Sequence, residues 1–374
     1  MFFTRELTEY IIPKMGKGKA IIVLGARQVG KTTMVRKLLE EVPHLFLNGD
    51  DPADRELLDR PNTEQLRSVI GKNKTVFIDE AQRIPDIGLS LKIIVDQFKD
   101  VQLIVSGSSA FEMANKMQEP LTGRKWEFVL YPLSWEELEK AFGYANVIKQ
   151  LELRILYGSY PDVVKTPEEG PELLKQLTDS YLFRDIFSFG GVRRPEQLEK
   201  LVKALALQIG NEVSYNELSQ LVGVDKNTIG NYVRLLEQSF IVFRLGAYSG
   251  NLRNEIKRNQ KIYFYDTGIR NAVLGNFTPL DLRSDKGALW ENFLIAERIK
   301  YNANHRKFVR PYFWRTTQQQ EVDYVEEINA KLTGFEIKWQ ARKNPHTPKT
   351  FKENYQAEIH VVDRNNFRDF VLPD

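Results

Sequence analysis

A glycine-bracketed loop near the N-terminus constrains this chain more than any other feature. Residues 21–24 read Ile-Ile-Val-Leu and predict a short buried strand. The next residues match the spacing G-x-x-x-x-G-K-[ST] at Gly25, Gly30, Lys31 and Thr32. Apolar residues then recur at helical spacing over residues 34–39. A loop of this kind between a strand and a helix turns its backbone N–H groups toward a polyphosphate, so the sequence predicts nucleotide binding.

The loop also supplies side chains with defined roles. Lys31 reaches the β- and γ-phosphates in such a loop, and the Thr32 hydroxyl can ligate Mg²⁺. The residues expected to bind the nucleotide are Gly25, Ala26, Arg27, Gln28, Val29, Gly30, Lys31, Thr32 and Thr33. With the strand before it and the helix after it, a chance match to the motif is the weaker interpretation.

A second apolar run ends in two acids. Residues 75–78 read Thr-Val-Phe-Ile and are followed by Asp79 and Glu80. Beside a phosphate loop, Asp79 is expected to hold Mg²⁺ directly or through water, and Glu80 to orient the attacking water. The alternative is an ordinary solvated acidic turn at the end of a strand, which the preceding loop makes the weaker interpretation.

Three further polar residues are candidates for the same site. Ser106 ends a predicted strand at residues 102–106, and Ser108 follows it; either could contact the γ-phosphate or the water, and the alternative is that they only form the loop. Arg124 could neutralise transition-state charge in its own chain or in a neighbouring one, or it is simply solvated.

The order of predicted elements and the composition together indicate the class of protein. Strands alternate with helices over the first 130 residues, which predicts a parallel sheet covered on both faces. A length of 374 residues suits two or three domains. There is no cysteine, so disulfide and thiolate chemistry are excluded, and the four histidines lack zinc-ligand spacing. The sequence shows no signal peptide or membrane-length apolar run, so we expect a soluble, cytoplasmic protein without a membrane partner.

Several segments together resemble a known family. The loop at residues 25–33, Ile-Asp-Glu-Ala-Gln at 78–82, Ser-Gly-Ser-Ser at 106–109 and Leu-Thr-Gly-Arg at 121–124 are similar to those of AAA-type ATPases of bacteria and archaea that carry a C-terminal DUF4143 domain. Segments at residues 181–185, 261–269 and 334–338 fit the same family. The resemblance covers nearly the whole chain and implies ATP as ligand and ATP hydrolysis as activity, but no defined biological role.

The middle of the chain predicts a helical lid and then a winged helix. In the lid, Arg184 and Asp185 are interpreted as structural rather than nucleotide-contacting. Two short helices joined by the turn at residues 222–225 resemble a helix-turn-helix. Candidate nucleic-acid contacts lie on the second helix at Lys226, Asn227, Thr228, Asn231 and Arg234, and in the following wing at Arg253, Lys257, Arg258 and Lys261. Because the net charge is only +3, any basic face must be local, and a protein-binding module remains the alternative.

The C-terminal region carries a second set of charged residues. Glu291 lies on a predicted helix, Asp323 on a strand at residues 321–325, and Glu336 and Lys338 two residues apart on a strand at residues 334–339. Carboxylates with a lysine can hold Mg²⁺ and activate water against a phosphodiester. The arrangement resembles the PD-(D/E)XK nuclease core. An inactive descendant that keeps the fold is the alternative.

The expected architecture is α/β: a P-loop parallel-sheet ATPase core over residues 1–142, a helical lid over 143–195, a central winged helix over 196–265 and a mixed α/β nuclease-like domain over 266–374. The expected function is a Mg²⁺-dependent ATPase that controls engagement of nucleic acid and cleaves it if the second site is active. The alternatives are an ATP-driven switch that binds a protein partner, and a transcription regulator. A homo-oligomer is a further expected partner state, since it would let Arg124 act on a neighbouring chain.

Overall fold

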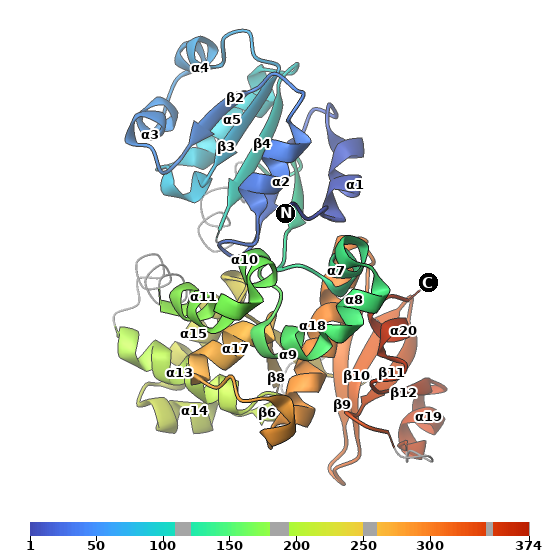
Figure 1. The fold of residues 1–374 in the computed structure, drawn as a ribbon. Helices are drawn as coiled ribbons and strands as arrows, with labels where there is room; N and C mark the ends of the chain where they lie inside the picture. Colours follow the sequence, from blue (N-terminus) through green and yellow to red (C-terminus); the bar gives the residue numbers. More distant parts are fainter. Residues whose placement is uncertain (109–120, 180–193, 250–259, 342–346, 374) are drawn as a thin grey trace. The chain divides into compact units, whose positions relative to one another are not determined.

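The computed structural model describes residues 1–108, 121–179, 194–249, 260–341 and 347–373 (Figure 1). They form two compact units. The N-terminal unit comprises Phe2–Pro132 with Gln238–Phe240, and the C-terminal unit comprises Leu133–Glu237 with Ile241–Asp374. No helix in the described ranges combines the length and apolar character needed to cross a bilayer.

A five-stranded sheet forms the centre of the N-terminal unit (Figure 1). Its order is β2-β3-β4-β1-β5, and every neighbouring pair is parallel. The strands are β1 (Ala20–Leu24), β2 (Leu45–Asn48), β3 (Thr75–Asp79), β4 (Gln102–Gly107) and β5 (Lys125–Val129). β1 and β3 are buried along their whole length, as expected for continuous apolar strands covered on both faces. The predicted parallel sheet is therefore confirmed.

Short helices precede the first strand or connect the strands of this sheet. They are α1 (Leu7–Ile11), the 3₁₀ turn η1 (Ile12–Lys14), α2 (Lys31–Leu38), α3 (Pro52–Leu58), α4 (Thr63–Ile70), the 3₁₀ turn η2 (Ala81–Arg83) and α5 (Ile87–Gln97). α2 begins directly after the phosphate loop. η2 begins directly after Glu80, which lies between it and β3. Both candidate catalytic segments therefore lie at the carboxyl ends of parallel strands, where ligands bind in open α/β sheets.

A seven-stranded mixed sheet forms the centre of the C-terminal unit, in the order β12-β11-β10-β9-β7-β8-β6. The strands are β6 (Glu212–Val213), β7 (Val242–Ala247), β8 (Gln260–Phe264), β9 (Arg310–Arg315), β10 (Glu321–Ile328), β11 (Lys331–Ile337) and β12 (Glu358–Val362). β7 pairs with β9 and β11 pairs with β12 in parallel, whereas the other neighbours are antiparallel. One continuous sheet thus joins strands on both sides of residue 265.

Helices make up the rest of the C-terminal unit. The first group is α7 (Trp135–Phe142), α8 (Tyr144–Lys149), α9 (Leu151–Tyr157), α10 (Pro161–Lys165), the 3₁₀ turn η3 (Pro167–Glu169) and α11 (Gly170–Leu177). The second group is α13 (Pro195–Leu207), α14 (Tyr215–Val222), α15 (Lys226–Gln238), α17 (Thr267–Leu274), the 3₁₀ turn η5 (Leu280–Leu282), α18 (Lys286–Asn304), α19 (Lys349–Tyr355) and α20 (Phe367–Val371). The longest described helix, α18, carries Glu291.

The two compact units divide the chain between residues 132 and 133. None of the boundaries expected from the sequence, at residues 142, 195 and 265, coincides with that division. The last of them falls between strands of one sheet. The four-domain organisation therefore stays a proposal about how the chain is assembled.

Candidate functional site

The phosphate loop has the backbone geometry that its glycines permit. Gly25 has a φ of +154°, and a Cβ built there would lie 2.1 Å from the carbonyl oxygen of Leu130. Gly30 has a φ of +95°, in the left-handed region, and forms the N-cap of α2. A side chain at position 25 cannot be accommodated without moving the neighbouring backbone. The loop therefore fits a phosphate cradle lined by backbone.

Lys31 is held inside this loop. Its side chain is buried, and its Nζ donates hydrogen bonds to the carbonyl oxygens of Gly25 at 2.9 Å and Ala26 at 2.8 Å. Burial lowers the pKa of the Lys31 ammonium to about 8, while the nearby carboxylates of Glu80 and Asp79 act in the opposite direction. The carbonyl oxygens hold the ammonium at the centre of the loop, which is where a polyphosphate would meet it.

Asp79 meets the start of α2. The Thr32 hydroxyl donates to Asp79 Oδ2 at 2.8 Å, and the Ser106 hydroxyl donates to Asp79 Oδ1. Asp79 and Ser106 are both buried. A hydroxyl and a carboxylate at hydrogen-bond distance are the hard oxygen ligands that Mg²⁺ takes, so Thr32 and Asp79 fit a magnesium site. Ser106 thus contacts the same carboxylate as Thr32.

Glu80 lies in the turn between β3 and η2. Its backbone is left-handed, with a φ of +47° and a ψ of +40°. Its Oε2 accepts a hydrogen bond from the side-chain amide of Gln82, and the same amide donates to Ser108 Oγ at 2.8 Å. Glu80 and Ser108 therefore both accept hydrogen bonds from the side-chain amide of Gln82. Our sequence reasoning left Gln82 out, although it is the fourth residue of the Asp-Glu-Ala-Gln run.

Arg5 is a second residue that sequence reasoning missed. Its guanidinium is buried and donates to the carbonyl oxygens of Val29 and Tyr131, both at 2.6 Å. Val29 belongs to the phosphate loop, so Arg5 fixes that loop from outside. Nothing in the local spacing around Arg5 signals this contact, because its partners lie 24 and 126 residues away.

Arg124 lies at the other end of the sheet from the phosphate loop. Its carbonyl oxygen accepts a hydrogen bond from the backbone N–H of Ala20, which is the first residue of β1. The phosphate loop follows Leu24, which is the last residue of β1. Four strand steps span about 13 Å. Its side chain pairs with Asp96 at 2.7 Å. The expectation that Arg124 acts on a nucleotide in its own chain is therefore wrong, because the chain enters β5 at the opposite edge. Action on a neighbouring chain remains the other alternative.

The C-terminal unit brings together a second set of charged residues. Lys338 Nζ lies 3.1 Å from Asp323 Oδ2 and 2.9 Å from Glu336 Oε2. Asp323 also accepts from the backbone N–H of Ile337 at 2.8 Å. Burial raises the pKa of Glu336, and the Asp323 carboxylate raises it further. Lys338 lies one residue beyond the end of β11, yet it reaches both acids.

Glu291 belongs to the same region but meets a different lysine. Lys261 Nζ lies 3.3 Å from Glu291 Oε1 and also pairs with Glu321, and the Tyr263 hydroxyl donates to Glu291 at 2.5 Å. Burial raises the pKa of Glu291, Lys261 opposes the shift and Asp323 adds to it. In the described part of the chain, the oxygens of Glu291, Asp323 and Glu336 do not all lie within 4.8 Å of one another.

Lys261 corrects one expectation about the wing. Our sequence interpretation assigned it to phosphate contact, but its side chain is 1% exposed and lies between two carboxylates. The remaining wing candidates, Arg253, Lys257 and Arg258, lie outside the described residues, as do Arg184 and Asp185. On α15, by contrast, Lys226, Asn227, Asn231 and Arg234 are all exposed, and Thr228 is half-buried.

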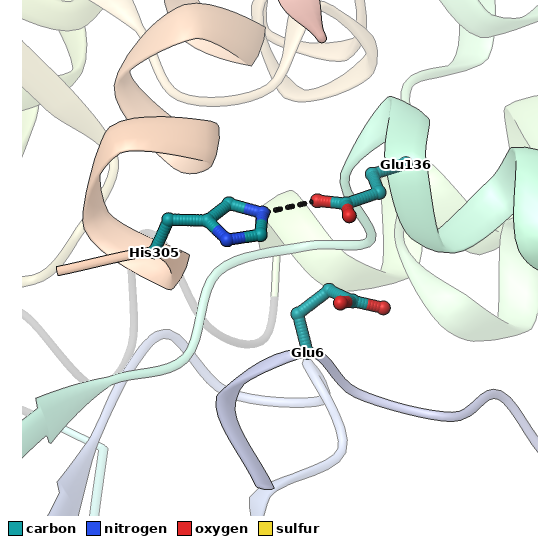
Figure 2. Close-up of side chains that lie close together, drawn as sticks. All are labelled: Glu6, Glu136 and His305. Carbon is teal, nitrogen blue, oxygen red and sulfur yellow. Dashed lines mark hydrogen bonds and ion pairs between the residues drawn. The ribbon is translucent and has the colours of Figure 1, made fainter. Parts of the chain in front are cut away.

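A histidine–carboxylate pair joins two helices of the C-terminal unit. Figure 2 shows His305, which follows α18, with its Nε2 2.6 Å from Oε2 of Glu136 on α7. Lys140 also pairs with Glu136, at 3.1 Å. Glu6, drawn in the same figure, belongs to the N-terminal unit and is not placed relative to this pair. We interpret the pair as a structural link between α7 and α18.

Comparison with known proteins agrees with the geometry of the N-terminal unit. An AAA domain matches residues 17–139, a domain of unknown function (DUF8612) matches residues 148–280, and a further domain of unknown function (DUF4143) matches residues 286–371. The fold also resembles the Walker-type ATPase PABY2304 of Pyrococcus abyssi, with a TM-score of 0.50 and 14% identity, over 73% of this chain and 96% of that one. The chain therefore contains a P-loop ATPase-like domain.

Two relatives extend the similarity along most of the chain. The uncharacterized protein Rv2008c of Mycobacterium tuberculosis is 28% identical over 328 residues, which is 86% of this chain and 70% of the relative. An uncharacterized protein of Haemophilus influenzae is 23% identical over 369 residues, which is 90% of this chain and 87% of the relative. The matches to an AAA domain and to a DUF4143 domain are the combination that the sequence resemblance implied.

Proposed function

We propose that this chain is a Mg²⁺-dependent ATPase that uses ATP hydrolysis to control engagement of nucleic acid. The observation that carries the proposal is the hydrogen bond between Thr32 and Asp79, at 2.8 Å, beside a buried lysine in a glycine loop. Thr32 lies on α2 and Asp79 ends β3, and the two residues lie 47 positions apart in sequence. A solvated acidic turn would not place Asp79 against the residue that follows Lys31.

The residues fit hydrolysis of a phosphoanhydride bond. Water attacks the γ-phosphorus, the bond to the bridging oxygen breaks, and ADP and phosphate leave. Lys31 stabilises the negative charge on the phosphates, and Glu80 orients the attacking water. Mg²⁺, held by Thr32 and Asp79, would neutralise charge on the β- and γ-phosphates.

Nucleotide binding can be measured independently of hydrolysis. We expect the full chain to bind a fluorescent ATP analogue and Lys31→Ala to lose most of that binding, because the substitution removes the cation at the centre of the loop. Lys37→Ala, on the exposed side of α2, is the matched control and is expected to bind normally. Equal affinity of Lys31→Ala and the wild type would contradict the assignment of this loop.

Nucleic acid is the proposed target because of the region around α15. The elements α13, β6, α14, α15, β7 and β8 follow the order of a winged helix, and β8 pairs antiparallel with both β6 and β7. α15 begins after Asp225, whose carboxylate accepts from the backbone N–H groups of Asn227 and Thr228. Its polar face is solvent-exposed, as a recognition helix requires.

Binding to duplex DNA at several salt concentrations tests this proposal. Arg234→Ala and Lys226→Ala should each weaken binding and make it less sensitive to salt, because each removes one phosphate-contacting cation. Lys349→Ala, an exposed lysine on α19, is the control and should leave binding unchanged. If all three variants bind equally, the alternative that this region binds a protein partner is favoured.

Phosphodiester cleavage is a second candidate function, favoured by the Lys338 geometry. β9, β10 and β11 form an antiparallel meander, and β12 lies parallel to β11. Lys338 bridges the carboxylates of Asp323 and Glu336, and Glu291 lies on the preceding helix α18. These side chains fit a site in which Asp323 and Glu336 hold a divalent cation while Lys338 contacts the scissile phosphate.

The cleavage proposal is tested on single- and double-stranded DNA and RNA with Mg²⁺ or Mn²⁺, with and without ATP. Cleavage should disappear in Lys338→Ala and persist in Lys331→Ala, which changes an exposed lysine at the start of β11. Sensitivity to Lys31→Ala would show that ATP gates the cut. No cleavage under any condition, with ATP hydrolysis intact, would favour the switch with an inactive C-terminal site.

A homo-oligomer is part of the same proposal. It is the arrangement in which Arg124 would reach a nucleotide, since it lies far from the loop of its own chain. Arg124→Ala should then lower hydrolysis without lowering nucleotide affinity, and the loss should depend on protein concentration. A concentration-independent rate would contradict this role.

A further inference from the structure

The turn after β3 holds Glu80 in a conformation that its own backbone does not favour. A left-handed conformation costs a non-glycine residue energy of about 1 kcal/mol or more, so the surroundings must impose it. Gly49 lies against this turn, since a Cβ there would be 2.3 Å from the Glu80 carbonyl oxygen. The Gly49 N–H also donates to the carbonyl oxygen of Asp79 at 2.9 Å. The end of β2 therefore fixes the peptide on each side of Glu80.

Gln82 fixes the Glu80 side chain. The Gln82 side chain is almost fully buried, with 1% exposure, and its Nε2 donates to both the Glu80 carboxylate and the Ser108 hydroxyl. Its Oε1 accepts from the backbone N–H of Ser108 at 3.3 Å. Because an ionised carboxylate only accepts hydrogen bonds, the amide must turn its NH₂ group toward Glu80. Both N–H donors of one amide are thereby used on two residues of the candidate site.

We propose that Gln82 is a positioning residue for ATP hydrolysis, which holds the Glu80 carboxylate for the attacking water and couples it to Ser108 at the end of β4. This inference rests on the proposed ATPase function. An ionised carboxylate has about four lone-pair sites, so the bond from Gln82 leaves acceptor capacity for water. A movement of Ser108 would shift the amide, and the amide would shift Glu80.

The role differs from that of a residue that merely stabilises the fold. A positioning residue lowers the rate of the chemical step when it is altered, and leaves nucleotide affinity unchanged, because Lys31 and the loop backbone bind the phosphates. A structural residue would lower the melting temperature and the affinity together. The separation of kcat from ATP affinity therefore distinguishes the two.

The test compares wild type, Gln82→Glu, Ser108→Ala and the control Gln97→Glu. Each protein is measured in steady-state ATP hydrolysis, ATP-analogue binding and thermal unfolding.

Gln82→Glu keeps the side-chain shape, removes both N–H donors and places a second carboxylate against Glu80. We expect kcat to fall by about ten-fold or more, since small displacements of catalytic groups have effects of this size. Affinity should stay within about two-fold, because the loop contacts are unchanged. Ser108→Ala removes the hydrogen bond between Gln82 Nε2 and Ser108 Oγ and should have a smaller effect in the same direction. Gln97, exposed at the end of α5, should tolerate the change.

The possible failures are distinguishable. If wild type binds ATP but does not hydrolyse it, the proposed function is overturned together with this inference. If wild type hydrolyses ATP and Gln82→Glu keeps its kcat, only this inference is overturned. A parallel fall of affinity, kcat and melting temperature would assign Gln82 a structural role. If Gln82→Glu fails to fold, Gln82→Asn is measured instead, because it retains the amide but shortens its reach. A lower kcat with unchanged ATP affinity in Gln82→Asn would support the positioning role, and an unchanged kcat would overturn it.

Discussion

At the scale of single residues, Gly25 shows why the phosphate loop tolerates so little change. A Cβ at this position would lie 2.1 Å from the Leu130 carbonyl oxygen, which would force the backbone of the loop away from the end of β5. We expect Gly25→Ala to lower the free energy of unfolding by about 1–3 kcal/mol and to abolish most nucleotide binding. Thermal unfolding and ATP-analogue titration measure both effects.

Gly287 provides the control for that substitution. It lies in the first turn of α18, with open space where a Cβ would go and no positive φ. Gly287→Ala should therefore be neutral or slightly stabilising, because alanine is the better helix former. If Gly25→Ala were as well tolerated as Gly287→Ala, the close approach between the loop and Leu130 would be contradicted.

At the scale of elements, Asp285 links α17 to α18. Its carboxylate accepts from Arg283 Nε at 2.8 Å and pairs with Arg270 at 2.7 Å. The hydrogen bond from Arg283 and the charge of Arg270 lower the pKa of Asp285 to about 2, against the effect of burial. Because this folded-state value lies below the unfolded value of about 3.9, the stabilisation is complete above about pH 4 and is lost as the pH falls toward about 2.

Acid unfolding measures this link. The wild type should lose about 2 kcal/mol of its free energy of unfolding between about pH 4 and pH 2 because Asp285 is protonated in this range. Asp285→Asn should not show this part of the loss. The variant should also be less stable at neutral pH, since two guanidinium groups lose their shared partner. Asp281→Asn, which alters an exposed pair with Lys286, should change little. An Asp285→Asn profile that retains the full acid-dependent loss would contradict the assignment.

The order of strands and helices could be predicted from the sequence, because burial and periodicity are local signals. β1 includes the predicted strand at residues 21–24, and β3 ends at Asp79, as predicted. Lys31, Thr32 and Asp79 meet because all three lie at carboxyl ends of parallel strands or directly beyond them. Position along the chain does not reveal which end of the sheet a segment meets, so the sequence could not show that Arg124 lies away from the phosphate loop of its own chain.

Tertiary partners explain what sequence reasoning missed. Arg5 reaches Val29 and Tyr131, and Lys261 reaches Glu291 and Glu321, across separations that no local pattern encodes. An isolated basic residue near a loop suggests solvent exposure. Lys261 is instead buried, because strand β8 carries it to the carboxylates of α18 and β10.

At the scale of the whole molecule, the seven-stranded sheet predicts that residues 133–374 fold as one unit. β7 pairs with β9 at Gly246 opposite Tyr312 and Ala247 opposite Phe313. The Tyr248 N–H also donates to the Phe313 carbonyl oxygen at 2.7 Å. Cutting the chain at residue 265 would leave one edge of β9 without its partner, and exposed edges promote aggregation.

Fragments test this prediction. A chain of residues 133–374 should be soluble and unfold cooperatively, whereas residues 266–374 alone should aggregate or lose protection from hydrogen exchange in β9. The reason is that the shorter fragment lacks both β7 and Lys261. Cooperative unfolding of residues 266–374 with protected β9 amides would show that the expected boundary at residue 265 separates independent domains after all.

The most direct measurement of the central claim is steady-state ATP hydrolysis by the full chain, with and without Mg²⁺, for wild type and Glu80→Gln. We predict Mg²⁺-dependent release of phosphate by wild type. Glu80→Gln should bind ATP with unchanged affinity but turn over at least about a hundred-fold more slowly, because the neutral amide replaces the carboxylate that orients the attacking water. Equal rates in the two proteins, or no hydrolysis by wild type with bound ATP, would contradict the account.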